Sequence, residues 1–504
     1  MGGKDDIVTT IAKGTVFLIA MQVLIFICGF ASKIVLTHWL SPDEVGVVSL
    51  TASWVGIFSV VFIMGVPGSI TRFIPEYLAK GRATEGLLST SLKIVLVGAA
   101  AGAISSFLMA DFLAINIFHQ PTAIEPFRIA SLIIFFTMLY RLFSYSVMGF
   151  QRMGRYVVLE SANTISTFFL TFAMLYMGYG LIGAVVSSLI SIIVTTTVSA
   201  YMLWRMSKFK LITGYNRDEA TTLMLFGIPF YSAVVIEMVL GWTDSFLLGA
   251  LRGTAQVGYY SIGLWMMGII ATITWPINTA IYPAFSELHA KAEHSRLEQI
   301  FNRSVKYNVV LLLPIATGSI MLADMIVPIF GTDFLPSISA VQILAIAAVF
   351  SSLRTTCTKF ISATGRPREV MKFVLIATVT NIVLNYFLIL RYDFAGAAVA
   401  TTISFGIFML LCFNFIRKSM RLSIDYLPHS IAALLVMIAV IIGLRYVYSL
   451  VSLPGSHYLS YLVLLVIIVI SGAVYFAALY LSGGLDETDM GMIKRYAGRY
   501  VKPR

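Results

Sequence analysis

The chain has 504 residues and is strongly apolar, since 59% of its residues are hydrophobic, 13% are aromatic and only 12% are charged. Soluble domains carry about 25% charged residues, so this composition excludes a soluble domain and predicts a polytopic membrane protein. The net charge of +11 would suit nucleic-acid binding, but the distribution of the cations along the chain argues against nucleic acid as a partner.

Apolar stretches of about 20 residues, the length that crosses the hydrocarbon core as a helix, recur from one end of the chain to the other. Short polar turns separate them, and no large soluble domain fits between them. The sequence therefore predicts an all-α polytopic membrane protein with about 14 transmembrane helices. In chain order they cover residues 11–36, 45–66, 87–112, 127–149, 157–178, 180–203, 221–249, 257–283, 301–325, 337–362, 369–391, 394–416, 428–450 and 457–481.

The first segment, MGGKDDIVTTIAKG, carries two acids, and no small-residue cleavage site follows the first apolar stretch. We therefore expect no removable signal peptide. Most lysines and arginines fall in every second loop, starting from the N-terminus, and in the C-terminal tail. By the positive-inside rule both termini are expected in the cytoplasm of a multi-pass protein of the cell membrane. The opposite loops hold only Arg128, Arg252, Arg391 and Arg445, all at helix edges.

The sequence lacks three well-known motifs for nucleotide binding and catalysis. There is no GxxxxGK[ST] loop for nucleotide phosphates, no HExxH and no nucleophile elbow, so we predict neither an enzyme nor catalytic residues. Cys28, Cys357 and Cys412 all fall inside expected spans, which predicts neither a disulfide framework nor a metal site. The DETD segment that begins at Asp486 is predicted to form a solvated turn in the cytoplasmic tail.

The sequence contains an internal duplication with a spacing of about 212 residues. LSPDEVGVVSLTASWVGI from Leu40 matches LRGTAQVGYYSIGLWMMGI from Leu251, EYLAKG from Glu76 matches ELHAKA from Glu287, and GAVVSSLIS from Gly183 matches GAAVATTIS. Because each half holds an even number of spans, both halves enter the membrane from the same side as parallel repeats. The predicted organisation is an N-terminal six-helix lobe (1–203), a cytoplasmic linker (204–220), a C-terminal six-helix lobe (221–416), and two additional transmembrane helices with a cytoplasmic tail (417–504).

Ionisable residues inside the expected spans are the candidate site. Arg141 and Arg354 occupy corresponding positions in the two halves. A charge near the bilayer centre costs about 2.5–3.5 kcal/mol on insertion scales, so it usually faces a bundle interior or a wet cavity. Lys33 and Lys359 would add positive charge to such a cavity, and Glu237 and Asp244 negative charge. The alternative is that these charges pair across helices, as Lys33 with Asp244, or reach toward an interface.

Three local motifs then suggest a family. SKIVLTHWLSPDEVGVVSL, the following TRFIPEYLAKGR and the turn GFQRMGRY, in the context of two six-span halves and two extra spans, resemble the polysaccharide transporter branch of the multidrug/oligosaccharidyl-lipid/polysaccharide flippase superfamily. Within this branch the chain is similar to Wzx-type O-antigen flippases and their archaeal counterparts. The resemblance covers essentially the whole chain.

This resemblance implies a flippase that moves a polyprenyl-phosphate-linked oligosaccharide from the cytoplasmic to the outer leaflet by alternating access. The substrate would lie in a cavity between the lobes, with Arg141, Arg354, Lys33 and Lys359 as its cations. Glu237 or Asp244 would hold a coupling Na⁺ or H⁺ or contact sugar hydroxyls. No other cofactor is expected, and the partners would be membrane lipids, the lipid-linked oligosaccharide and a polysaccharide polymerase or ligase, with the protein itself a monomer.

Two other functions stay open on the sequence. A cation-coupled multidrug exporter of the same superfamily would have twelve spans and acidic groups in one lobe, whereas this chain has fourteen expected spans and internal arginines that suit an anionic substrate. A scaffold in an envelope-assembly complex would not need charge buried in the membrane. We therefore favour the flippase.

Overall fold

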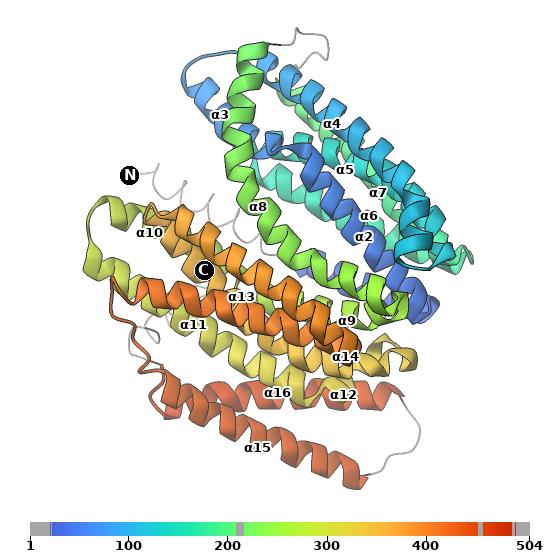
Figure 1. The fold of residues 1–504 in the computed structure, drawn as a ribbon. Coiled ribbons are helices and arrows are strands. Elements are labelled where there is room, and N and C mark those ends of the chain that lie inside the picture. The colour runs from blue at the N-terminus through green and yellow to red at the C-terminus, as the bar shows by residue number, and fades with distance from the viewer. Residues whose placement is uncertain (1–20, 22, 208–215, 452–456, 486–488, 490–504) are drawn as a thin grey trace, which may run out of the picture. The chain divides into compact units, whose positions relative to one another are not determined.

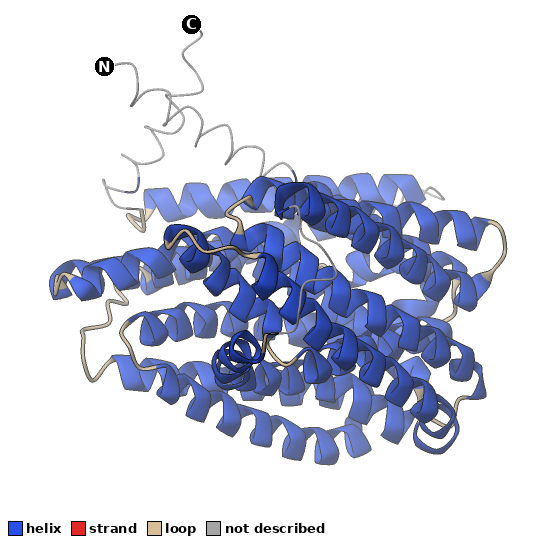
Figure 2. Cartoon of the chain, turned by 90° about the horizontal axis from the view of Figure 1, so that it is seen from above, coloured by secondary structure: helices blue, strands red, loops and turns tan. Residues whose placement is uncertain are grey.

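The computed structural model describes residues 21, 23–207, 216–451, 457–485 and 489. Within this part the chain consists of helices and connecting loops, with no strand (Figure 2). The predicted all-α class is therefore confirmed. The chain divides into two compact units, and the division falls inside two of its helices, α9 and α14.

The first unit comprises residues 1–261 and 381–397. It begins, in the described part, with the helix Val23–Trp39. The helices that follow are α2 (Pro42–Ile63), α3 (Val66–Ala79), α4 (Glu85–Phe112), α5 (Ile124–Gly149), α6 (Met153–Tyr176), α7 (Gly180–Ser207) and α8 (Arg217–Arg252), with a π-helical turn η1 (Leu113–Ile117) and a 3₁₀ turn η2 (Pro121–Ala123) between α4 and α5.

The LSPDEV motif forms a capping box at the start of α2. The hydroxyl of Ser41 accepts a hydrogen bond from the backbone N–H of Glu44, and the Glu44 carboxylate accepts one from the backbone N–H of Ser41 at 2.9 Å. Pro42 occupies the first turn, where a missing N–H costs nothing. The helix ends where Met64 and Gly65 adopt positive φ angles of 50° and 73°, and α3 begins directly afterwards. Local sequence thus fixes both ends of this helix.

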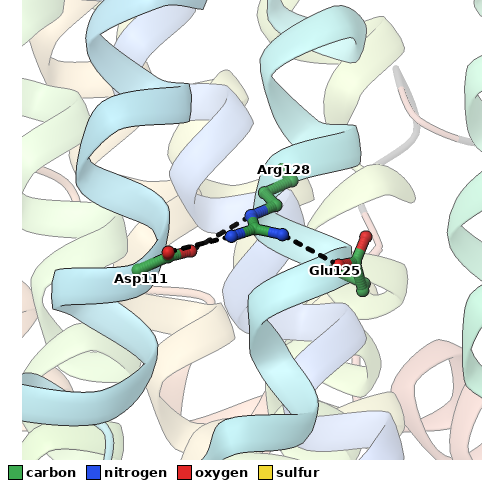
Figure 3. A network of polar contacts seen from close by, with 3 residues as sticks. All are labelled: Asp111, Glu125 and Arg128. Atoms are coloured by element: carbon green, nitrogen blue, oxygen red, sulfur yellow. Dashed lines mark hydrogen bonds and ion pairs between the residues drawn. The ribbon is translucent and has the colours of Figure 1, made fainter.

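Helix α5 is the centre of the first unit, because it packs on α2, α3, α4 and α7. A cluster of buried side chains from α5, α6 and α7 includes Ile133, Val147, Leu159 and Ile192. At the α4–α5 connection, Arg128 donates two hydrogen bonds to Asp111, at 3.1 and 2.9 Å, and one to Glu125 at 3.1 Å (Figure 3). This network ties the end of α4 to the start of α5.

The second unit comprises residues 262–380 and 398–504. Its helices, including the two that begin in or pass through the first unit, are α9 (Thr254–Thr272), α10 (Trp275–Ala290), α11 (His294–Met321), α12 (Ala323–Ile326), α13 (Ile338–Ala363), α14 (Pro367–Ile416), α15 (Leu427–Val451) and α16 (His457–Leu481). The 3₁₀ turns η3 (Val327–Phe330) and η4 (Thr332–Ser337) precede α13.

The order of elements repeats along the chain, as the duplication predicts. Each half begins this order with two consecutive helices separated by a break (α2 and α3, α9 and α10). A long helix follows (α4, α11), then short turns, and then another long helix (α5, α13). Helix α8, which the sequence assigns to the second lobe, packs on α2, α3 and α4 and belongs to the first unit. The two units are defined by contacts in the structure, whereas the two lobes are defined by the sequence repeat. The units therefore do not test the lobe boundaries, which stay a prediction.

The number of membrane spans is not confirmed as fourteen. In the described part, ten helices are long and apolar enough to cross a membrane, or eleven if α9 and α10, bent by 58°, form one span. The first expected span lies partly outside the described residues, and α8, which carries Glu237 and Asp244, is not among the ten. The expected spans 369–391 and 394–416 correspond to the two parts of α14, which are separated by a kink at Asp393, where φ is 51° and ψ is −135°.

Helices α15 and α16 lie side by side (Figure 1) and pack on α11. Near the far end of α11, Arg445 of α15 pairs with Asp324 at 2.5 Å. Near its middle, Lys306 pairs with Asp489 at 2.7 Å, and both side chains are buried, with 8% and 4% exposed. The expectation of a solvated DETD turn is therefore wrong at Asp489. Its carboxylate contacts the lysine and accepts a hydrogen bond of 2.6 Å from the hydroxyl of Tyr307, and not from solvent. The other three residues of that segment lie outside the described residues.

Candidate functional site

Arg141 lies on α5 in the first unit and its side chain is exposed. It lies within electrostatic range of Glu160 and Tyr231, and the hydroxyl of Tyr140 donates a hydrogen bond of 3.0 Å to Glu160. Among the described residues, no carboxylate is within 4.0 Å of the Arg141 guanidinium. The guanidinium is therefore available to a ligand.

Arg354 lies on α13 in the second unit and is half-buried. Its guanidinium carbon is 4.7 Å from the ring centre of Phe405 and 5.3 Å from that of Phe408, both on α14. A cation over aromatic faces is attracted by their electron density, and the attraction grows when water is excluded. The aromatic rings therefore hold this arginine in one orientation, which Arg141 lacks.

Lys359 lies about one and a half turns after Arg354, and it donates a hydrogen bond of 2.6 Å to the backbone carbonyl of Asn278. This contact fixes the ammonium group beside the start of α10. Lys359 therefore serves at least partly to satisfy a backbone carbonyl, and its role as a cavity cation stays a prediction.

The side chain of Asn278 belongs to a buried polar ring, which was not predicted from the sequence. Thr356 donates to the side-chain oxygen of Asn278 at 2.6 Å, Asn308 donates to the Thr356 hydroxyl at 3.2 Å, and Ser352 donates to the side-chain oxygen of Asn308 at 2.8 Å. All four side chains are less than 4% exposed. The ring joins α10, α11 and α13 within the second unit. Single asparagines and threonines in apolar helices are too common to reveal it in advance.

Lys33 is half-buried on the helix Val23–Trp39 and donates a hydrogen bond of 2.9 Å to the Ser261 hydroxyl. Ser261 in turn donates to the carbonyl of Gly258 at 2.7 Å. No ion pair joins Lys33 to Asp244 among the described residues. The alternative in which these two charges neutralise each other is therefore wrong for this structure.

Asp244 forms a second buried polar cluster, in the first unit. Its carboxylate is only 1% exposed, and it accepts hydrogen bonds from the hydroxyl of Tyr260 at 2.7 Å and from the amide nitrogen of Asn385 at 2.5 Å. The side-chain oxygens of Asn385 and Asn381 are buried and accept no hydrogen bond from the described residues. Asn381 and Asn385 lie one turn apart on α14, on the same helix face.

This cluster offers a carboxylate and the unsatisfied amide oxygen of Asn385, with the amide oxygen of Asn381 one helical turn away. Such oxygens are the ligands that hard cations prefer. Asn381 and Asn385 were not predicted, although an Asn pair four residues apart in an apolar stretch was a readable signal. Glu237 lies two turns before Asp244 on α8 but is exposed. Within the described residues, no group of three His, Cys, Asp or Glu side chains could hold a metal ion.

A close helix crossing lies beside Lys33 and Ser261. A Cβ atom on Gly46 would lie 1.8 Å from the carbonyl oxygen of Thr254, and one on Gly258 would lie 2.0 Å from that of Pro42. Gly46 corresponds to Gly258 in the duplication, and Pro42 corresponds to Thr254. The contact between α2 and α9 is therefore symmetric with respect to the repeat, and only glycine permits it.

The predicted site residues divide between the two units. The first unit contains Arg141, Lys33, Glu237 and Asp244, and the second contains Arg354 and Lys359. Within the first unit, Lys33 and Asp244 contact neighbouring residues of α9, Ser261 and Tyr260. The proposal that Arg141 and Arg354 grip one phosphate from two sides stays a prediction.

Comparison with known proteins gives one family match. Residues 35–339 match the model of a family described as polysaccharide biosynthesis protein. The chain is 23% identical over 399 residues to the probable low-salt glycan biosynthesis flippase Agl15 of Haloferax volcanii, an alignment that covers 77% of this chain and 79% of that one.

Two solved structures show the same fold. The lipid II flippase MurJ in an inward closed conformation aligns with a TM-score of 0.70 at 18% identity, covering 91% of this chain and 99% of that one. A multidrug resistance MATE family transporter of the MOP superfamily, in an inward-facing conformation, aligns with a TM-score of 0.70 at 14% identity, covering 80% of this chain and 97% of that one. Because a lipid flippase and a drug transporter both match, these likenesses describe the fold and do not separate the two functions.

Proposed function

The chain belongs to the family of polysaccharide biosynthesis proteins, and from this premise we propose that it is a flippase. It moves a polyprenyl-phosphate-linked oligosaccharide from the cytoplasmic to the outer leaflet for the assembly of a cell-surface polysaccharide or glycan, by alternating access. The observation that carries the proposal is the pair of arginines at corresponding intramembrane positions, Arg141 and Arg354, in a chain that has few charged residues.

The chemistry of the substrate explains why such arginines are kept. A phosphate-linked sugar carries negative charge and many hydroxyls, and its transfer into hydrocarbon without partners is very costly. Arginine binds phosphate oxygens through two parallel N–H groups and remains charged at any physiological pH. Arg141, which is exposed and has no carboxylate partner within the described residues, suits this task, while the prenyl chain stays in the lipid.

The further details of the proposal follow from the same substrate. The protein acts without catalysis, in the cell membrane with both termini in the cytoplasm, as a monomer, and it passes its product to a polysaccharide polymerase or ligase. The alternative is a cation-coupled multidrug exporter, which the fold permits. The name of the archaeal relative and the intramembrane arginines both favour an anionic, glycan-bearing substrate.

Transport is coupled to a monovalent cation at Asp244. Na⁺ bound there would take the carboxylate of Asp244 and the amide oxygens of Asn385 and Asn381, which otherwise have no donor among the described residues. We expect Asp244→Asn to abolish the Na⁺ dependence of transport. Glu237→Gln removes a charge from the same helix at an exposed position and serves as the matched control. If Asp244→Asn retains the ion dependence of the wild type, the cation is bound elsewhere.

Deletion of the gene, followed by extraction of lipid-linked oligosaccharides, tests the function directly. The proposal predicts that a polyprenyl-linked oligosaccharide accumulates and stays accessible only from the cytoplasmic side, and that wild-type protein, but not Arg354→Ala, restores its translocation. Normal translocation in the deletion strain, combined with new sensitivity to cationic drugs, would instead indicate the exporter.

A further inference from the structure

Two adjoining pockets lie at the end of the second unit where α11 begins, which the charge distribution predicts to be cytoplasmic. One is polar, has a volume of about 230 Å³ and is lined by Arg303, Lys306 and His429 among others. The other is mostly apolar and has a volume of about 440 Å³. The two share Asn302, Ser423 and Tyr426 in their linings, so they lie next to each other.

The apolar pocket lies among three helices, α11, α13 and α14. Val309 of α11, Leu353 of α13 and Phe413 of α14 contribute to its wall, and Arg417 lies at its rim just after α14. The polar pocket is completed by the segment before α15 and by the end of α16. Because α15 and α16 lie outside the duplication, the polar pocket includes segments to which nothing in the first repeat corresponds.

The electrostatic character of the joined pockets is positive. Lys306 is paired with Asp489, which lines neither pocket. The carboxylate in the lining of the polar pocket is that of Asp425, which accepts a hydrogen bond of 3.0 Å from the hydroxyl of Ser423. Arg303 and Arg417 are exposed, and within the described residues no carboxylate lies within 4.0 Å of either guanidinium. Each pocket therefore contributes one arginine that is available to an anion.

We propose that the joined pockets bind a membrane phospholipid with a small anionic phosphate head group. Arg303 and Arg417 bind the phosphate, Asp425 accepts hydrogen bonds from head-group hydroxyls, and one acyl chain occupies the apolar pocket. Basic pockets between transmembrane helices on the cytoplasmic side are the usual place for such head groups. The combination of a charged pocket with an adjoining apolar one distinguishes a lipid from a free anion, which would need only the first.

The size of the polar pocket argues for a resident lipid and against the transported glycan. Drug-sized ligands occupy pockets of about 300–1,000 Å³, and 230 Å³ is smaller than that range. The polar part therefore has room for a phosphate and a few hydroxyls, but not for an oligosaccharide. This inference does not depend on the proposed function, because it concerns a site that neither Arg141 nor Arg354 lines.

Native mass spectrometry of the purified full-length protein tests the proposal, with dioleoyl phosphatidylglycerol as the probe and dioleoyl phosphatidylcholine as the neutral comparison. We expect phosphatidylglycerol to bind at least about tenfold more tightly than phosphatidylcholine. The double variant Arg303→Gln/Arg417→Gln is expected to lose about tenfold or more in affinity, the effect of one charge-assisted contact. Lys418→Gln removes the same charge from a neighbouring residue outside both linings and should bind like the wild type.

A second variant separates the two parts of the site. Met409→Trp narrows the apolar pocket without changing any charge, and it should weaken lipid binding while leaving the thermal unfolding temperature close to that of the wild type. Equal affinity of the double arginine variant and the wild type would overturn the proposal, as would equal binding of the two lipids. Protection against unfolding by inorganic phosphate as strong as that by phosphatidylglycerol would show a free-anion site and would also overturn it.

Discussion

Arg141 and Arg354 occupy corresponding positions in the two halves of the duplication, but they are held differently. Arg141 is exposed, whereas Arg354 is half-buried over the rings of Phe405 and Phe408. The duplication has therefore preserved the charge and not its surroundings. An arginine fixed on aromatic faces is already oriented for a ligand, while an exposed one must lose rotamer freedom when it binds.

The residues that flank the two arginines also differ, in their polarity. Ser352 and Thr356 flank Arg354 and belong to the buried polar ring, whereas the corresponding positions beside Arg141 hold Leu139 and Phe143. A polar network in a low-dielectric interior is stable only when every member is satisfied. The second unit therefore depends on a specific set of hydrogen bonds at positions that are apolar in the first unit.

Substitution of the two arginines should have the largest effect and should separate their roles. We expect both Arg141→Ala and Arg354→Ala to lower translocation by about tenfold or more, because each removes a charge-assisted contact with the phosphate that is worth about 1.5–3 kcal/mol. Only Arg354→Ala should also destabilise the protein, by about 1–2 kcal/mol, because it removes the cation from two aromatic rings. A translocation assay in vesicles and the thermal unfolding of the purified variants measure the two effects.

Lysine variants serve as controls, since Lys keeps the charge but not the bidentate geometry. Arg141→Lys should retain more activity than Arg354→Lys, because an exposed side chain can adjust its position. Full translocation by Arg141→Ala at normal protein levels would exclude a two-sided grip on the phosphate. Equal loss of stability in both alanine variants would show that their surroundings are more alike than the structure indicates.

The glycines of the repeat provide a second comparison with a large effect on stability. Gly46→Ala and Gly258→Ala each place a Cβ atom about 2 Å from a carbonyl oxygen of the facing helix, so α2 and α9 must separate. Overpacking of this kind costs about 1–3 kcal/mol or more. Thermal unfolding and helix content of the purified variants should show the loss.

Gly268 supplies the matched control for these variants. It corresponds to Gly56 in the duplication and lies in α9, but a Cβ atom there meets nothing within 4 Å. Gly268→Ala should therefore leave stability unchanged or raise it by up to about 1 kcal/mol through helix propensity. Equal tolerance of Gly46→Ala and Gly268→Ala would show that α2 and α9 do not cross closely in the membrane.

The outcome shows which features a sequence makes predictable in such a protein. The apolar stretches coincide with helices because length and hydrophobicity are local properties, and the capping box at Ser41 fixes a boundary in the same local way. The duplication was readable for the same reason. The break at Asp393 falls between the expected spans 369–391 and 394–416, so its place was readable from the sequence. Its ion pair with Arg252 of α8, at 2.9 Å, depends on a residue far away in the chain and could not be read locally.

The candidate site was predictable in its charges and not in its partners. Arg141, Arg354 and Asp244 stand out because ionisable groups are rare in apolar helices. Their neighbours are ordinary polar or aromatic residues, such as Phe405 beside Arg354 and Asn385 beside Asp244, whose importance arises only from packing between distant helices. The misreading of Asp489 has the same cause, since Lys306 lies far from it in the sequence.

The polar ring permits a sharper test of the difference between the units. Thr356→Val removes the donor to Asn278 and the acceptor for Asn308, so buried groups lose their partners at a cost of about 1–3 kcal/mol. Thr355→Val is the control, because the Thr355 hydroxyl bonds only the carbonyl of Ser351 in its own helix. Equal unfolding temperatures of the two variants would indicate that water replaces the lost contacts and that the ring is not essential to the second unit.

The smallest expected effect concerns a feature that the two halves share. Glu76 and Lys80 pair at 2.5 Å, as do Glu287 and Lys291 in the second half. Lys80, through its hydrogen bond and its charge, lowers the pKa of Glu76 below its ordinary value of 4.5. The pair therefore stabilises the folded state above the ordinary pKa, and this contribution disappears as the pH falls through the lowered one. We expect Glu76→Gln to lower the unfolding temperature slightly at neutral pH, and the difference from the wild type to vanish once the pH falls below the lowered pKa of Glu76 and in high salt. A difference that persists at low pH would mean that the Glu76 side chain stabilises α3 by packing and not by charge.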